Sequence, residues 1–359
     1  MESINDYLKF TVERSGSDLH LKAGGPAFVR VDGDLKPISK LPPLSPKDTE
    51  AFAREIMDAR TAKQFLETGE ADFALSVSGL GRFRVNAFRQ RGSIGMVLRR
   101  VLAETPDFES LGLPPAVRAL AEEHRGLVLV TGPTGSGKTT TTAAMLGHIN
   151  QTRRCHIVTI EDPIEVLHRD EMAIIDQREI GVDTENFQTA MKAVSRQDPD
   201  VIFIGEMRDL ETISAALQAA ETGHMVISTL HTTDATETVN RIVDMFPKEQ
   251  QNQARLSLAN SLKGIVCQRL APRATGAGRV AVVEICVVTE RIKNFLTDPA
   301  ELHQLEDAIA EGEFFGMQTF DQHLLTLYAD GIVSLQDALN AATDQHDFRV
   351  SLRAAGLTK

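Results

Sequence analysis

The sequence predicts a two-domain α/β protein, in which a small α+β domain precedes a larger domain built on a mainly parallel sheet. Three observations predict this fold class. The chain has 359 residues, a length typical of two domains. Near residue 100 its pattern changes from short apolar runs between Gly and Pro turns to apolar strands that alternate with helices. One of those strands, at residues 127–131, leads directly into a glycine-rich loop.

The first domain is expected at residues 1–101. Residues 83–88 alternate between apolar and polar side chains, which is typical of a half-buried strand. Residues 28–31 form a second short strand-like run, and residues 46–65 have the apolar spacing of a helix. Together these segments predict a small mixed domain.

A linker is expected at residues 102–116, because a cluster of helix-breaking residues interrupts regular structure there: Pro106, Gly112, Pro114 and Pro115. The second domain is then expected at residues 117–359. Its strand-like runs are residues 127–131, 157–160, 201–204 and 225–230, with helices expected at 186–197 and 210–222. Strands that are apolar on both faces and separated by helices indicate a parallel sheet. From about residue 247 the chain is expected to be largely helical, with one strand at 279–288.

Composition limits the class of protein. The formal net charge is −12 and the pI is about 5.4, which argues against nucleic acid as the main partner. The three cysteines lie in apolar runs without a C-x-x-C pair, so they are expected to be buried in a reducing compartment. The N-terminus lacks the pattern of a signal peptide, and no apolar stretch is long enough for a transmembrane helix. A cytoplasmic protein is therefore expected.

A phosphate-binding loop is predicted at residues 132–139, which match G-x-x-x-x-G-K-[ST] between a strand and a helix expected at 139–149. Backbone N–H groups of such a loop surround phosphate groups, and the helix N-terminus favours negative charge. Lys138 is expected to contact the β- and γ-phosphates of ATP, and Thr139 to bind Mg²⁺. The expected phosphate-binding residues are Gly132, Pro133, Thr134, Gly135, Ser136, Gly137, Lys138, Thr139 and Thr140.

An ATPase also needs carboxylates for the attacking water and for the metal shell. Glu161 follows the strand at 157–160, and Glu206 follows the strand at 201–204. Parallel strands bring their carboxyl ends to the edge where ligands bind, so both glutamates are expected near the γ-phosphate. Gly205 occupies the position where the usual Walker B pattern has Asp, which favours Glu161 as the base.

These motifs resemble those of the secretion ATPase superfamily, and the whole chain resembles the PilT/PilU kind of type IV pilus retraction ATPase. The matching segments are residues 131–139 (Walker A), 159–165 (Asp box), 205–209 (Walker B) and 221–232 (His box). Residues 17–20 and 316–321 also fit this resemblance.

The resemblance implies a PAS-like N-terminal domain, a RecA-like core with a helical C-terminal part, and a hexameric ring with ATP bound between the domains near subunit interfaces. It implies that Glu161 is the catalytic glutamate and that Glu206 is the Walker B glutamate, which holds Mg²⁺ through water. It also implies that His231 senses the γ-phosphate; His224 is a weaker candidate.

The resemblance further implies that arginines reach the nucleotide, because a cationic fork offsets charge in the transition state. Arg84, Arg99 and Arg241 are the arginines expected in this role, ahead of Arg82 and Arg100. The implied partners are an inner-membrane pilus platform protein and a paralogous retraction ATPase, with no direct nucleic acid. The implied location is the cytoplasmic side of the inner membrane at the pilus base.

Alternatives remain open. Residues 291–298 only partly match a stretch found in the PilT kind, residues 83–100 and 320–342 look like the PilU kind, and residues 205–212 look like the PilT kind. The principal and the accessory retraction motor are therefore both possible. The other candidates are a pilus-assembly or type II secretion ATPase, a RecA-like DNA translocase, and a ring subunit that does not hydrolyse ATP. The first commonly has a four-cysteine metal element, and the second predicts basic or aromatic pore loops; the sequence shows neither.

Overall fold

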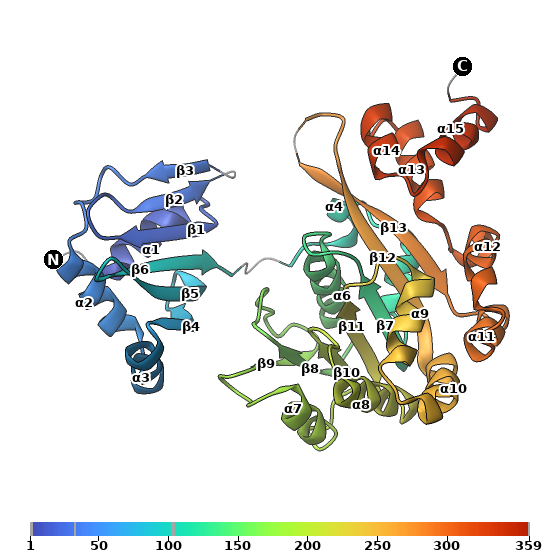
Figure 1. Cartoon of the computed structure of the whole chain (residues 1–359), viewed down its shortest axis with the longest axis horizontal. Helices are drawn as coiled ribbons and strands as arrows, with labels where there is room; N and C mark the ends of the chain where they lie inside the picture. The colour runs from blue at the N-terminus through green and yellow to red at the C-terminus, as the bar shows by residue number, and fades with distance from the viewer. Residues whose placement is uncertain (1–2, 32–33, 102–104, 277, 358–359) are drawn as a thin grey trace. The chain divides into compact units, whose positions relative to one another are not determined.

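The computed structural model describes residues 3–31, 34–101, 105–276 and 278–357 (Figure 1). The chain divides into two compact units, one comprising Met1–Ala103 with Glu165–Leu167 and the other Glu104–Ile164 with His168–Lys359. The first three residues of the expected linker, 102–104, lie outside the described residues.

The first unit is a six-stranded antiparallel sheet in the order β3-β2-β1-β6-β5-β4. Its strands are β1 (Asp18–Lys22), β2 (Phe28–Val31), β3 (Asp34–Pro37), β4 (Glu70–Val77), β5 (Gly81–Gln90) and β6 (Ser93–Arg100). Its helices are α1 (Ile4–Glu13), α2 (Pro46–Ile56) and α3 (Ala59–Thr68). Alternate residues of β1, β5 and β6, among them Leu21, Val85 and Leu98, are buried with Phe52 and Phe65 of the helices.

The helical segment expected at residues 46–65 is divided into two helices by its capping residues. Ser45 accepts a hydrogen bond from the N–H of Asp48 and Pro46 occupies the first turn of α2, so that helix begins here. Asp58 then accepts from the N–H of Thr61 and starts α3. The apolar spacing continues across the break, which is why the sequence pattern alone predicted one segment.

The second unit is built on a seven-stranded sheet in the order β13-β12-β7-β11-β10-β8-β9 (Figure 1). Only β13 runs antiparallel among these described strands, so the expectation of a mainly parallel sheet is confirmed. The strands are β7 (Gly126–Thr131), β8 (His156–Glu161), β9 (Ile174–Glu179), β10 (Val201–Ile204), β11 (Met225–Leu230), β12 (Leu262–Pro272) and β13 (Arg279–Val287).

Helices cover both faces of this sheet. Residues of α6 and α5 pack in one core cluster, and residues of α7, α8, α9 and α10 pack in the other. The helices are α4 (Phe108–Leu111), α5 (Pro115–Ala121), α6 (Lys138–Thr152), α7 (Phe187–Val194), α8 (Leu210–Glu221), α9 (Ala235–Asp244), α10 (Gln251–Ser261), α11 (Glu290–Thr297), α12 (Leu305–Ala310), α13 (Phe320–Ala329), α14 (Leu335–Ala341) and α15 (Gln345–Ala354). Three short 3₁₀ turns are η1 (Lys248–Gln250), η2 (Leu302–Gln304) and η3 (Glu313–Phe315).

Other parts of the chain also differ from the sequence expectation. Residues 105–116, expected to lack regular structure, contain α4 and the start of α5, where Pro115 begins the helix rather than breaking it. The segment after residue 247, expected to be helical apart from one strand, also contains β12. A Cβ atom at Gly264 would come within 2.6 Å of Leu120 and 2.8 Å of the Cys286 carbonyl oxygen. β12 is therefore packed tightly against α5 and β13, and these contacts cannot be predicted from the local sequence pattern.

Candidate nucleotide-binding site

Five neighbouring parallel strands carry the site on their carboxyl ends. In sheet order, β12 contains Gln268 and β7 leads into the phosphate-binding loop. The next strand, β11, leads to His231, β10 leads to Glu206, and β8 ends at Glu161. Because parallel strands end at one edge of the sheet, residues far apart in the chain lie side by side there. The predicted carboxylates and the predicted loop therefore share one edge.

The phosphate-binding loop is held by β12. Thr141 of α6 donates a hydrogen bond to Oε1 of Gln268 at 2.8 Å, and Nε2 of Gln268 donates to the carbonyl of Ser136 at 2.8 Å. A Cβ atom at Gly132 would lie 2.3 Å from the Gln268 carbonyl oxygen, and one at Gly137 would lie 2.7 Å from Nε2. The loop therefore needs these two glycines, because β12 fills the space that side chains would occupy.

Gln268 is a site residue that the sequence analysis missed. Its side chain is buried, with 2% of the residue exposed. No sequence signal pointed to it, because β12 itself was not expected and a glutamine in an apolar run has no diagnostic spacing.

The side chains of the loop fit a phosphate group. Lys138 is largely buried, and its ammonium group donates to the carbonyls of Gly132 at 2.7 Å and Pro133 at 3.1 Å, which holds its charge over the loop. The hydroxyl of Ser136 is buried and has no hydrogen-bond partner among the described residues. Gly137 adopts φ 92° immediately before α6, so the loop turns into the helix N-terminus, where negative charge is favoured.

The donor set also fits a magnesium ion that is shared with phosphate oxygens. Within the part of the chain that the structure describes, no group of three or more His, Cys, Asp or Glu residues could hold a metal by itself. Thr139 is exposed in the first turn of α6. A P-loop needs few protein ligands for Mg²⁺, because phosphates and water complete the octahedral shell.

Glu161 is buried and oriented by its neighbours. Thr159 donates to its Oε1 at 2.6 Å from the same strand, and Nε2 of Gln177 on β9 donates to the same oxygen at 3.1 Å. Oε1 of Gln177 in turn accepts the N–H of His168 at 2.9 Å. These bonds fix the orientation of the carboxyl group. A general base needs such a fixed orientation to form a hydrogen bond with one water molecule.

Glu206 and His231 lie together at the ends of β10 and β11. Nε2 of His231 lies 3.2 Å from one carboxylate oxygen of Glu206, and Arg208 donates to the other at 2.7 Å. Burial by itself would raise the pKa of Glu206, but the Arg208 hydrogen bond and the charges of His231 and Arg208 hold that pKa below its ordinary value. The carboxylate is therefore negative at neutral pH, as water-mediated metal binding requires.

Gly205 occupies the position that usually holds the Walker B Asp, directly after β10 and beside the end of β8. Its N–H donates to the carbonyl of Ile160 at 2.8 Å, and a Cβ atom would lie 3.3 Å from that oxygen and 3.4 Å from Cα of Glu161. β10 and β8 therefore approach closely at this point. A Cβ atom at position 205 would therefore contact the backbone around Glu161 closely, and a small shift would accommodate it.

His224, which precedes β11, and Arg241, on the helix that follows it, have different surroundings. Nδ1 of His224 lies 3.0 Å from the carbonyl of Ala219, at the other end of β11 from His231, which fits a structural role. Arg241 is exposed in the last turn of α9, one turn after Glu237. The described residues show no contact between Arg241 and the loop or the carboxylates at the sheet edge.

Three arginines of the first unit, Arg30, Arg99 and Arg84, lie in a row across its sheet. Arg30, Asp18, Arg99 and Arg84 stand directly opposite one another on β2, β1, β6 and β5. Asp18 accepts from Arg99 at 2.8 Å and lies 3.8 Å from Arg30, whereas Arg84 is exposed beside Arg99. Burial tends to raise the pKa of Asp18, but the hydrogen bonds from Arg99 and Ser17 keep it lowered. Like charges directly opposite each other destabilise a sheet, so the placement of Arg84 opposite Arg99 is unfavourable.

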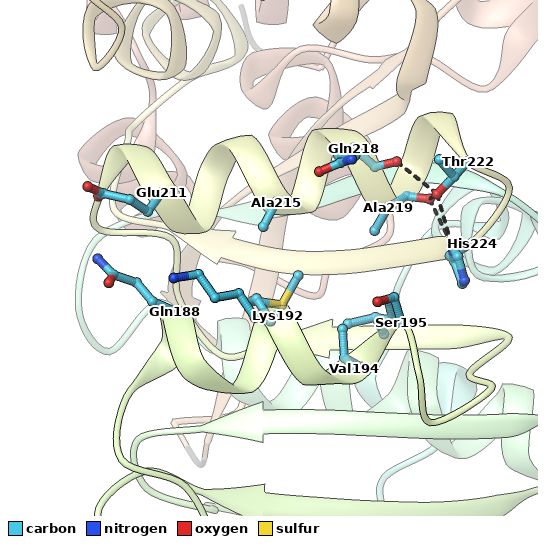
Figure 2. Close-up of a pocket in the computed structure, with 12 residues that line it drawn as sticks. Gln188, Lys192, Val194, Ser195, Glu211, Ala215, Gln218, Ala219, Thr222 and His224 are labelled. Carbon is cyan, nitrogen blue, oxygen red and sulfur yellow. Dashed lines mark hydrogen bonds between the residues drawn. The ribbon is translucent and has the colours of Figure 1, made fainter.

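A separate pocket of about 340 Å³ lies between α7 and α8 (Figure 2). Its lining includes Met191 and Lys192 of α7 and Gln218 and Ala219 of α8. These helices belong to the core cluster on the face of the sheet opposite the one that α6 covers. The pocket is therefore not the phosphate site.

Comparisons with known proteins agree with this arrangement. Residues 4–340 match the family model described as Type II/IV secretion system protein. The chain is 45% identical to the Type IV pilus retractation ATPase PilT of Pseudomonas aeruginosa, over 96% of this chain and 99% of that protein. It is 42% identical to the Type IV pilus ATPase PilU of the same organism, over 96% of this chain and 90% of that protein.

A solved structure extends the similarity to three dimensions. A crystal structure titled as the pilus retraction motor PilT with bound ADP shares 46% identity, with a TM-score of 0.90 over 97% of this chain and 99% of that one. None of the helices among the described residues is long and apolar enough to cross a membrane.

Proposed function

Since this chain belongs to the family of type II/IV secretion system proteins, we propose that it is an ATP-hydrolysing motor subunit that powers retraction of type IV pili. The observation that carries the proposal is the buried Glu161, oriented by Thr159 and Gln177 on the sheet edge that also bears the phosphate-binding loop. The nearly end-to-end match with a pilus retraction ATPase in sequence and in structure, rather than a match to the loop alone, supports the retraction assignment.

In this proposal the loop, the buried glutamate and the metal-binding residues have separate roles in hydrolysis. The loop N–H groups and Lys138 bind the phosphates of ATP, with Lys138 on the β- and γ-phosphates. Glu161 orients the attacking water and accepts its proton, so that ADP and inorganic phosphate are released. Thr139 and, through water, Glu206 would hold Mg²⁺, which when bound neutralises phosphate charge.

His231 and the arginines complete the proposed site. His231 reports on the γ-phosphate through its contact with Glu206, because a change at either partner alters their 3.2 Å interaction. Arg84, Arg99 and Arg241 supply positive charge to the phosphates. The placement of Arg84 directly opposite Arg99 supports this role for the first two, because like charges opposite each other are unfavourable for a sheet.

The assembly that we propose is a cytoplasmic ring of six identical subunits at the pilus base. The ring would act on an inner-membrane platform protein, and a paralogous retraction ATPase is a candidate partner. Resemblance to the PilT/PilU kind supports these partners.

Deletion of the gene in its own host tests the function. Surface pili are counted by electron microscopy while twitching is scored. Many pili without twitching are expected for the principal retraction motor, and many or normal pili with partial motility for the accessory one. Bald cells would contradict retraction and indicate an assembly motor instead.

Complementation provides the matched control. The intact gene should restore wild-type pili and motility, whereas the Lys138→Ala gene should not, because retraction by this motor requires nucleotide binding. Full restoration by Lys138→Ala would separate the phenotype from ATP hydrolysis.

A further inference from the structure

Glu284 is a buried carboxyl group that the proposed chemistry does not use. It lies on β13 with 6% of the residue exposed, and its Oε1 accepts the N–H of Ala235 at 2.9 Å. Ala235 is the first residue of α9, and the segment immediately before this helix contains His231. A carboxylate that accepts a first-turn N–H satisfies one of the donors that a helix N-terminus leaves without a partner.

The groups that face Glu284 are acidic or neutral. They are Asp234 at the start of α9, Glu306 on α12, and the thiols of Cys267 on β12 and Cys286 on β13. The described residues give Glu284 no ion pair with Lys, Arg or His. Burying a carboxyl group without a neighbouring cation lowers the free energy of unfolding. Packing alone therefore does not explain why Glu284 occupies this position.

Burial raises the pKa of Glu284 to about 7, with the Ala235 hydrogen bond acting in the opposite direction and Asp234 adding to the rise. The carboxyl group therefore exchanges its proton near neutral pH.

The position of Glu284 connects two parts of the proposed site. On one side, its neighbour Cys267 precedes Gln268, which holds the phosphate-binding loop through Ser136 and Thr141. On the other side, α9 continues from the segment that places His231 beside Glu206. A second bond, between the hydroxyls of Thr232 and Thr238 at 2.6 Å, ties that segment to the helix.

We propose that Glu284 is a positioning residue that fixes the first turn of α9 on β13 and thereby holds His231 in place beside Glu206. This inference rests on the proposed ATPase function, and in particular on the role of His231. Glu284 is not proposed to contact the nucleotide or the attacking water. It acts on the site only by holding the first turn of α9.

A double-mutant cycle in the full-length chain tests the inference. Glu284→Leu keeps the side-chain size but cannot accept the Ala235 N–H, and we expect kcat for ATP to fall about tenfold with little change in KM. Glu284→Gln can still accept that bond and should stay within about twofold of wild type. In the His231→Ala background, Glu284→Leu should cause no further loss of kcat, because its effect passes through His231.

Two outcomes of the cycle would overturn the inference. One is an equal loss of kcat for Glu284→Leu with and without His231. The other is no effect of His231→Ala on kcat, which would leave the ATPase standing but remove the residue through which Glu284 acts. Absence of hydrolysis by the wild-type chain would contradict the proposed function itself, so the two failures are distinguishable.

A stability measurement tests the buried carboxyl without using activity. Because its pKa is raised in the folded chain, the folded state binds the proton more tightly, and stability falls as pH rises from the ordinary value of 4.5 to about 7. The unfolding temperature of wild type should therefore decrease relative to that of Glu284→Gln across this range. No such relative decrease would show that the carboxyl is solvated or paired with a cation, and the inference would fall.

Discussion

At the residue scale, the carboxyl group of Glu161 is held in one orientation by two neighbouring side chains. An ordinary surface glutamate rotates freely, but here the hydroxyl of Thr159 and the amide of Gln177 both donate to one carboxylate oxygen. The sequence located this residue because it follows a buried strand beside a phosphate-binding loop. Neither the strand pattern nor the loop predicts that Gln177, sixteen residues further along the chain, would orient it.

Glu161→Gln should abolish most turnover while nucleotide still binds. The amide is nearly the same size as the carboxylate but cannot accept a proton from water, and loss of such a group costs about 10²–10⁴-fold in kcat. Phosphate release and equilibrium binding of a fluorescent ATP analogue measure the two quantities. Lys138→Ala is the matched control, because it should weaken binding itself. Near-normal turnover in Glu161→Gln would assign the base elsewhere.

At the scale of elements, β12 determines the shape of the phosphate-binding loop. Its Gln268 bonds both to the loop and to α6, and its backbone leaves no room for a Cβ atom at Gly132. The loop is therefore held from outside by a strand more than a hundred residues away in sequence, as well as by its own glycines. Such support matters because a phosphate site must be formed before the ligand arrives.

Gln268→Leu should raise KM for ATP and lower the free energy of unfolding by about 1–3 kcal/mol, because it leaves the Ser136 carbonyl and the Thr141 hydroxyl buried without partners. Steady-state kinetics and denaturant unfolding measure these effects. Gln268→Glu separates the two bonds, since it still accepts from Thr141 but no longer donates to Ser136. A wild-type KM in Gln268→Leu would show that the loop keeps its shape without β12.

The whole molecule combines an antiparallel unit that carries a row of charged residues and a mainly parallel unit with a nucleotide site. The row Arg30–Asp18–Arg99–Arg84 crosses four strands, and within it Asp18 pairs with Arg99 and lies 3.8 Å from Arg30. A sheet gains nothing by placing Arg84 opposite Arg99. This like-charge pair is consistent with the proposed role of Arg84 in nucleotide binding.

Arg84→Ala in the full chain should lower kcat by about tenfold or more, because a cation that stabilises phosphate charge is lost. The same change should leave the unfolding temperature unchanged or slightly higher, since it removes a like-charge neighbour of Arg99. Lys63→Ala, at an exposed position of α3, is the control and should change neither quantity. Loss of stability together with activity in Arg84→Ala would indicate a structural arginine.

By itself, the sequence determined the class of fold, the parallel strands β7, β8, β10 and β11, and the residues that local patterns mark. The loop at 132–139, Glu161 and Glu206 belong to this group, because each follows a continuous buried strand. Only the tertiary structure decided the parts that depend on contacts between distant segments. β12 was missed because its stability comes from β7 and β13 on either side, and Gln268, Gln177 and Glu284 have no local signature. Their roles arise from hydrogen bonds across the sheet, and the folded chain alone brings those partners together.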